Sequence, residues 1–280
     1  MIDFHTHPLL VREIIGDNPE LLKVTRKIFD IGNNLQPLDI FFLEMDVSEI
    51  EKAVLLPIDC RRSKGLPILT NEIIGKLCKE NSRFMGFASV DPIDKDASKN
   101  LEEDVKKWNL KGLKLSPATQ DFSPTDKEHA YPVYEKASSL NLPILFHMGM
   151  SWEPGTKITP GYPMLLEEVA YDFPNLNIVI AHFGWPWVVE TAALSLKYKN
   201  VYIDTSALYF DSPKEFIYFA MNRQIPVTLI ERSLRDKIVF GSNYPRVEIK
   251  NMANAIRSLG LSEGCLELIF KENAEKLLNI

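Results

Sequence analysis

The stretch Ile178-Val179-Ile180-Ala181-His182 is a short apolar run that ends in a histidine, and Pro143-Ile144-Leu145-Phe146-His147 repeats this pattern upstream. Short apolar runs rich in β-branched residues are typical of strands that are buried on both faces. The sequence contains eight such runs, which therefore predict eight strands. They lie at residues 2–6, 52–58, 84–90, 111–116, 142–147, 176–182, 200–206 and 237–242.

Amphipathic segments separate these runs. From Ala97 to Trp108, apolar residues recur at spacings of three and four among Glu and Lys, which predicts a helix. Strands that alternate with helices form right-handed βαβ units, and eight units predict a closed (β/α)8 TIM barrel of the α/β class. The 280 residues suit such a barrel, which needs roughly 250 residues. We expect one domain over residues 1–280.

Two segments depart from this regular alternation. The link over residues 8–50 is longer than one βα unit requires, and we expect it to cover part of the barrel mouth. The segment from Ser262 to Ile280 predicts two short helices that pack on the barrel exterior.

Composition limits the classes of function. The 38 acidic residues outnumber the 32 Lys and Arg residues, which argues against a nucleic-acid surface. The sequence has no apolar run near the roughly 20 residues of a membrane-spanning helix and no signal-peptide pattern. Cys60, Cys78 and Cys265 lie far apart, which predicts free thiols in a reducing compartment. We expect a cytoplasmic protein with a small-molecule substrate, and the sequence leaves homo-oligomerisation open.

Four of the five histidines lie at the ends of predicted strands. His5 and His7 close the first run, His147 the fifth and His182 the sixth. A lone histidine in an apolar strand is more often a core residue, but a barrel places the C-terminal ends of its strands around one mouth. The four imidazoles together therefore predict an active site. His129 lies in a polar segment and is expected at the surface.

The pattern His5-Thr6-His7 predicts two imidazoles on one face of the first strand, because side chains alternate along a strand. Phe4 and Thr6 would take the other face. Asp3 would share the face of the imidazoles one step deeper in the barrel, where its carboxylate could orient a ligating imidazole.

Several motifs, in this order, resemble signatures of the amidohydrolase-related family. They are Ile2-Asp3-Phe4-His5-Thr6-His7, Ile180-Ala181-His182-Phe183-Gly184, Val201-Tyr202-Ile203-Asp204-Thr205-Ser206, Phe240-Gly241-Ser242-Asn243-Tyr244-Pro245 and Glu272-Asn273-Ala274-Glu275-Lys276-Leu277-Leu278. The resemblance spans essentially the whole chain. It implies a metal-dependent hydrolase, a lactonase or a nonoxidative decarboxylase similar to aminocarboxymuconate semialdehyde decarboxylase.

The resemblance also implies roles for individual residues. His5, His7 and His147 would ligate one divalent ion, and three nitrogen ligands favour zinc. His182 would be catalytic and would act on the substrate or on bound water. The family pattern has an aspartate at position 243 as a further ligand and base, whereas this chain has Asn243. An amide can still coordinate through its oxygen, but it cannot accept a proton near neutral pH.

Lys114 should point into the barrel if Leu113 and Leu115 point outward. In a site with one metal ion, it would bind an anionic group of the substrate or pair with a carboxylate. Some relatives carry a carboxylated lysine that bridges two metals, and we rank this possibility lower. A third interpretation is that the Lys114 side chain reaches solvent.

Three further residues follow strands closely, where βα loops build the pocket of a barrel enzyme. Trp152 and Trp185 predict contact with a flat or ring-containing substrate, with core packing as the alternative. Arg246 could clamp a carboxylate of the substrate in bidentate fashion, with a surface position as the alternative.

The sequence is compatible with three functions. The first is a metal-dependent hydrolase of a small, carboxylated or ring-containing amide, lactone or related compound, in which His182 transfers a proton. The second is a nonoxidative decarboxylase of an aromatic or unsaturated carboxylic acid, which depends less on a base at Asn243. The third is a binding or regulatory protein whose catalysis is impaired by Asn243.

Overall fold

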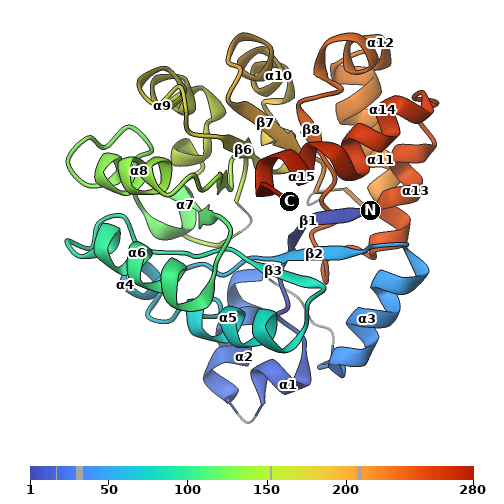
Figure 1. Cartoon of the computed structure of the whole chain (residues 1–280). Helices are drawn as coiled ribbons and strands as arrows, with labels where there is room; N and C mark the ends of the chain where they lie inside the picture. The colour runs from blue at the N-terminus through green and yellow to red at the C-terminus, as the bar shows by residue number, and fades with distance from the viewer. Residues whose placement is uncertain (17, 30–33, 152, 207–209) are drawn as a thin grey trace.

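The computed structural model describes residues 1–16, 18–29, 34–151, 153–206 and 210–280. In these residues eight parallel strands form a ring, and helices surround it (Figure 1). All eight predicted strands are present, most of them shorter than predicted because the chain turns into a βα loop early. They are β1 (Ile2–Thr6), β2 (Lys52–Leu55), β3 (Phe84–Gly86), β4 (Leu113–Leu115), β5 (Ile144–Phe146), β6 (Ile178–Ile180), β7 (Val201–Asp204) and β8 (Ile238–Val239).

Two seams close the ring into a barrel. Strands β1 to β3 and β4 to β8 each form a parallel sheet in sequence order. Between β3 and β4, Ala88 N donates to Gly112 O at 2.8 Å and Lys114 N donates to Ala88 O at 2.7 Å. Between β8 and β1, Phe4 N donates to Phe240 O at 2.8 Å. The predicted TIM barrel is confirmed.

The helices follow the expected alternation, and local sequence explains where several begin and end. The predicted helix over Ala97–Trp108 is present with these bounds. Helix α5 begins after Thr70, whose hydroxyl accepts the N–H of Ile73 at 3.2 Å, as expected of a threonine N-cap. The α-helices are α1 (Arg12–Ile15), α2 (Pro19–Phe29), α3 (Leu38–Val47), α4 (Arg61–Lys64), α5 (Asn71–Glu80), α6 (Ala97–Trp108), α7 (Pro117–Gln120), α8 (Ala130–Ser139), α9 (Leu166–Asp172), α10 (Val188–Lys197), α11 (Pro213–Tyr218), α12 (Val227–Leu229), α13 (Ile249–Arg257), α14 (Glu263–Glu267) and α15 (Asn273–Leu278). Short 3-10 turns are η1 (Thr159–Gly161), η2 (Pro163–Leu165) and η3 (Ala181–Gly184), and π-helical turns are η4 (Phe219–Gln224), η5 (Ile230–Leu234) and η6 (Leu268–Glu272).

The last helix closes one end of the barrel. Ala274, Leu277 and Leu278 of α15 pack in one cluster with interior strand residues such as Phe4 and Phe87. In Figure 1, α15 lies across the centre of the ring of strands. The expectation that the C-terminal segment packs on the barrel exterior is wrong for this helix. Its apolar residues form one face at helical spacing, and the open end of the barrel interior offers that face an apolar partner.

The long link after β1 contains the first barrel helix. Phe41 of α3 stacks on Phe84 and Tyr244, with ring centroids 5.4 Å and 4.5 Å away. The extra residues therefore precede α3, and they leave the barrel at the C-terminal end of β1. The strand-end histidines occupy that same end of the barrel. That this segment covers part of the mouth stays a prediction.

The three cysteines are free thiols, as predicted, with Cys60 and Cys265 buried and Cys78 partly buried. None of the helices within the described ranges combines the length and the apolar character needed to cross a membrane.

Candidate active site

The four strand-end histidines meet in the barrel mouth, as predicted. The ring centroid of His5 lies 5.0 Å from that of His7 and 4.9 Å from that of His182. His147 lies 4.7 Å from His182 by the same measure. His129 lies at the surface beside Asp126, with 2.9 Å between Nδ1 and Oδ2, as expected.

The first strand contains an irregularity that sets the direction of its side chains. Asp3 pairs with Ala53 and Thr6 with Leu55, so β1 has one residue more than β2 over this stretch. Such an extra residue breaks the alternation of side chains. Phe4 packs in the interior cluster, and His5 also faces the interior. The prediction that Phe4 and His5 take opposite faces is therefore wrong.

His182 reaches the site through a turn rather than a strand. Ala181 belongs to the interior cluster, so regular alternation would send the next side chain outward. Instead, His182 and Phe183 adopt left-handed backbone conformations, with φ of 58° and 52°. This turn brings the His182 imidazole back toward the histidine cluster, and its backbone N–H donates to Asp204 Oδ1 at 2.8 Å.

Asp204, at the end of β7, is the carboxylate that orients the cluster. Its Oδ2 accepts from His5 Nδ1 at 2.6 Å. Its Oδ1 accepts from the backbone N–H of Ser206 at 3.0 Å and from the Ser206 hydroxyl. Sequence reasoning missed this residue, although it is the only acidic residue in the motif over residues 201–206. Ligand atoms of His5, His182 and Asp204 lie within 4.8 Å of one another.

Asp3 does not have the role expected from the sequence. Its carboxylate accepts from the backbone N–H and the hydroxyl of Ser242 and from the backbone N–H of His5. Because these partners belong to β1 and the segment after β8, Asp3 fixes the seam of the barrel. The expectation that it orients an imidazole is wrong. Burial raises the pKa of Asp3 to about 7, against the effect of the hydrogen bonds from Ser242 and His5.

The hydrogen bonds of the imidazoles assign their tautomers, provided that the rings are neutral. Burial lowers the pKa of His5, His7 and His182 well below the usual value. Burial and the charge of Lys114 lower the pKa of His147 to about 3. At neutral pH each ring therefore carries one N–H, and that N–H points to whichever neighbour can only accept.

Each N–H points away from the centre of the cluster. His5 Nδ1 faces the Asp204 carboxylate, and His7 Nδ1 lies 2.9 Å from Leu56 O. His182 Nδ1 lies 3.1 Å from the carbonyl oxygen of Ser206. His147 Nε2 lies 3.3 Å from the carbonyl oxygen of Met150, the longest of these contacts. All these neighbours accept hydrogen bonds, so the remaining ring nitrogens are unprotonated.

The unprotonated nitrogens face one another in two pairs. His5 Nε2 and His7 Nε2 lie 3.1 Å apart, and His182 Nε2 and His147 Nδ1 also lie 3.1 Å apart. Two lone pairs at this distance repel unless a cation lies between them. Two nitrogens bound at roughly 2.0–2.1 Å to one tetrahedral zinc would lie about 3.3 Å apart. Each pair therefore offers two nitrogen ligands for a divalent ion, and His5, His182 and Asp204 bring three ligand atoms within 4.8 Å of one another.

Lys114 lies close to this cluster, since its charge when protonated contributes to the lowered pKa values of His5 and His147. Leu113 and Leu115 pack in the core between strands and helices, and Lys114 points inward between them, as predicted. The Lys114 side chain is fully buried, and among the described residues its Nζ has no hydrogen-bond partner. Burial lowers the pKa of Lys114 to about 7, while the charge of Asp204 opposes this shift. The interpretation that Lys114 reaches solvent is wrong.

Asn243 and Gly241 follow β8 beside His5. The Asn243 backbone donates to His5 O at 2.9 Å and has a φ of 68°, a left-handed conformation that asparagine tolerates. A Cβ at Gly241 would lie 2.8 Å from the Cβ of His5, so a larger residue there would displace the imidazole. The predicted role of Asn243 as a ligand stays a prediction.

The predicted substrate-binding residues differ in their surroundings. Arg246 is partly buried. Its charge contributes to the lowered pKa of His147, which places Arg246 near that imidazole. Trp185 packs edge-on against Phe210, with ring centroids 5.8 Å apart, which agrees with the core-packing alternative. Trp152 lies outside the described residues.

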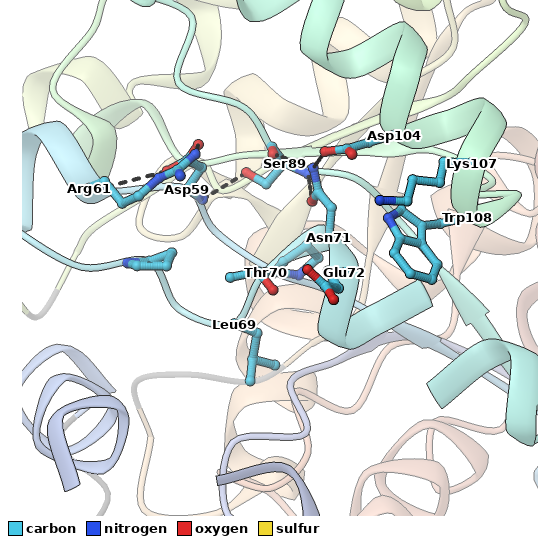
Figure 2. Close-up of a pocket in the computed structure, with 12 residues that line it drawn as sticks. Asp59, Arg61, Leu69, Thr70, Asn71, Glu72, Ser89, Asp104, Lys107 and Trp108 are labelled. Atoms are coloured by element: carbon cyan, nitrogen blue, oxygen red, sulfur yellow. Dashed lines mark hydrogen bonds and ion pairs between the residues drawn. The ribbon is translucent and has the colours of Figure 1, made fainter. Parts of the chain in front are cut away.

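A surface pocket of about 270 Å³ lies on the flank of the barrel, between the segment after β2 and helices α5 and α6 (Figure 2). Its polar side chains bond one another. Asn71 Nδ2 donates to Ser89 O at 3.0 Å and to Asp104 Oδ2 at 2.8 Å, and Arg61 pairs with Asp59 at 2.6 Å. The histidine cluster does not line this pocket, so we assign the candidate active site to the barrel mouth.

The chain matches the model of one protein family, and several solved structures have a similar fold. An uncharacterised TIM-barrel protein from Bordetella bronchiseptica is 23% identical, with 100% of this chain and 98% of that chain covered and a TM-score of 0.77. A probable 2-pyrone-4,6-dicarboxylic acid hydrolase from Acinetobacter baumannii is 16% identical, with coverages of 100% and 99% and a TM-score of 0.68. A 5-carboxyvanillate decarboxylase from Novosphingobium aromaticivorans with bound manganese is 17% identical, with coverages of 100% and 97% and a TM-score of 0.67.

At these identities the similar structures show the fold alone. The search of curated proteins gives no match. The model of the amidohydrolase family matches residues 2–280, which is almost the whole chain. The protein therefore belongs to the amidohydrolase family.

Proposed function

We propose that this protein is a metal-dependent hydrolase that acts on a small carboxylated substrate. The observation that carries the proposal is the pair of unprotonated nitrogens of His5 and His7, 3.1 Å apart, in a mouth where two more imidazoles face each other in the same way. Membership of the amidohydrolase family supports an enzyme, and its similar folds include both a hydrolase and a decarboxylase.

His5, His7 and His147 would hold one divalent ion, with zinc the favoured metal. When bound, the ion would polarise a carbonyl of the substrate and activate water. Asp204 would keep the His5 ring in place through its 2.6 Å contact with Nδ1, and the carbonyl of Leu56 would do the same for His7. Outer contacts of this kind orient metal-binding imidazoles and fix their tautomers.

His182 is the proposed proton acceptor. The Ser206 hydroxyl donates to Asp204 and lies 2.7 Å from His182 Nδ1. A carboxylate connected in this way to the N–H side of an imidazole stabilises the ring when its other nitrogen takes up a proton. His182 could therefore supply the base that the amide of Asn243 cannot. This connection is the reason why we rank hydrolysis first.

Lys114 and Arg246 are the proposed anchors for the substrate carboxylate. The buried Lys114 ammonium has no hydrogen-bond partner in the described part of the chain, and burying a charge without a partner is costly. An anionic group on the substrate would supply that partner. Arg246 has a guanidinium suited to bidentate contact with a carboxylate.

Nonoxidative decarboxylation is the second candidate, and Asn243 is the observation that favours it. An amide at this position limits catalysis by a base, while release of carbon dioxide needs a proton donor at carbon. An activity screen over lactones, amides and aromatic acids distinguishes the candidates. Product acids indicate hydrolysis, carbon dioxide indicates decarboxylation, and metal retention without turnover favours a binding protein.

The first prediction concerns metal content. The double variant His5→Ala, His7→Ala should lose the bound divalent ion, because it removes two of the three proposed nitrogen ligands. The measurement is metal stoichiometry by elemental analysis after incubation with zinc or manganese and dialysis. His129→Ala is the matched control, because it removes a surface imidazole and should leave the stoichiometry unchanged. Full stoichiometry in the double variant would show that the ligands are assigned wrongly.

The second prediction concerns Asn243. Asn243→Asp should tighten metal binding and raise or create hydrolytic activity, because it adds an anionic ligand and a base. Asn243→Ala serves as the control that removes the amide without adding charge. Competition with a chelator measures the affinity, and product release measures the activity. If the Asp variant leaves both the metal affinity and the activity unchanged from wild type, position 243 is outside the site.

The third prediction concerns Lys114. Lys114→Met should raise KM for carboxylated substrates by about 10–100-fold, the loss expected for one hydrogen bond to a charged group. KM for an uncharged analogue should change little. Lys111→Met is the control, because the Lys111 ammonium binds Asn109 at the surface. Equal effects on charged and uncharged substrates would contradict a carboxylate anchor.

A further inference from the structure

After β5, the described residues 149–151 and 153–161 begin and end at a narrow neck on the barrel rim, where Gly149 meets Gly161. Gly149 N donates to Gly161 O at 2.7 Å, and Met150 N donates to Trp185 O at 2.9 Å. A Cβ on Gly149 would lie 2.2 Å from Trp185 O, and a Cβ on Gly161 would lie 2.2 Å from Gly149 O. Both positions therefore need glycine for the neck to close this tightly.

This neck contacts the histidine cluster directly. The carbonyl oxygen of Met150 lies 3.3 Å from His147 Nε2. Because a carbonyl only accepts, this contact keeps the proton of His147 on Nε2 and leaves Nδ1 unprotonated toward His182. If the neck moved, His147 would lose the partner that selects this tautomer.

A buried ion pair holds the same segment from its other side. Glu153 Oε1 lies 2.9 Å from Nζ of Lys64, which is the last residue of α4, and Lys64 Nζ donates to Thr156 Oγ1 at 3.0 Å. The Glu153 side chain is only 7% exposed, and within the described ranges its Oε2 has no hydrogen-bond partner. Lys64 is thus the group that offsets the burial of this carboxylate, and removal of one partner would leave an uncompensated charge.

Hydrogen bonds hold helix α4, which carries Lys64, against neighbouring segments of the barrel. Ser63 Oγ donates to Thr119 O of α7 at 2.7 Å, and Arg62 Nε donates to Asp91 Oδ2 at 2.8 Å. The βα segments after β2, β3, β4 and β5 are therefore connected to one another through α4.

We propose that the Lys64–Glu153 ion pair is a clasp that holds residues 153–161 against α4 and, through the neck and the Met150 carbonyl, keeps His147 Nδ1 turned toward His182. Lys64 and Glu153 are positioning residues, since they act through His147. This inference rests on the proposed function only for its effect on metal binding. The closure of the segment and the tautomer of His147 are properties of the metal-free protein.

The first measurement is tryptic cleavage after Lys157, which is exposed in this segment, followed by mass spectrometry of the native protein. Lys64→Met and Glu153→Gln should each cleave at least about 10-fold faster than wild type. The reversed pair Lys64→Glu, Glu153→Lys should restore slow cleavage, and the introduced lysine precedes Pro154, so trypsin does not cut there. Lys136→Met is the matched control, because it breaks the 2.6 Å pair with Glu102 away from the mouth.

The second measurement is the tautomer of His147 in the metal-free protein, read from long-range proton–nitrogen NMR correlations of the imidazole. Wild type should carry the proton on Nε2, and the two single variants should show a mixture of tautomers. Metal affinity should fall by about 10-fold in the single variants, the lower end of the loss typical for groups that orient a ligand.

Cleavage of the single variants at the rate of Lys136→Met would overturn the clasp. An unchanged His147 tautomer in variants that cleave faster would overturn its link to the site. A wild type that binds no metal would contradict the proposed function instead, and the cleavage and tautomer measurements would still decide the clasp. Glu153→Gln keeps the shape of the side chain, so it guards against a variant that fails to fold.

Discussion

The repulsion between unprotonated imidazole nitrogens in the barrel mouth is the constraint on which the rest of the site depends. Burial keeps the rings uncharged, and each single N–H is committed to an acceptor outside the cluster. The lone pairs are therefore left to face one another. An arrangement of this kind is costly for an empty site and favourable around a cation, which is why the geometry points to a metal centre rather than to a packed core.

The acceptors that impose this arrangement come from distant parts of the chain. Asp204 ends β7 and Ser206 follows it closely. Leu56 directly follows β2, and Met150 lies in the segment after β5. Closure of the barrel brings them within reach of the imidazoles. The extra residue in β1 and the left-handed turn at His182 then turn the rings toward the centre. The seam at Asp3 and the small Gly241 leave room for His5 at that point.

The charges of the site complement the proposed ligands. The buried Lys114 ammonium and the Asp204 carboxylate are of opposite sign, and the imidazoles are neutral at pH 7. A divalent ion together with a carboxylated substrate would add charge of both signs. The substrate anion would give the buried Lys114 ammonium a partner. The metal cation would remove the repulsion between the lone pairs of the histidines.

The sequence predicted the parts of this account that depend on local pattern. Apolar runs located the strands, and histidines at strand ends predicted the convergence of four imidazoles. The parts that depend on pairing between strands were not predictable in this way. An extra residue in β1 changes the direction of Phe4, and a left-handed turn redirects His182. Likewise, the role of Asp204 requires β7 to lie within reach of His5, and the position of α15 depends on which apolar surface remains open.

We propose that His5, His7 and His147 hold one metal ion and that His182 lies beside it as the proton acceptor. Crystals grown with zinc and measured on both sides of the zinc absorption edge test it most directly. We expect one anomalous peak within bonding distance of His5 Nε2, His7 Nε2 and His147 Nδ1. A peak confined to other parts of the molecule, with the imidazoles still facing one another without an ion, would contradict it.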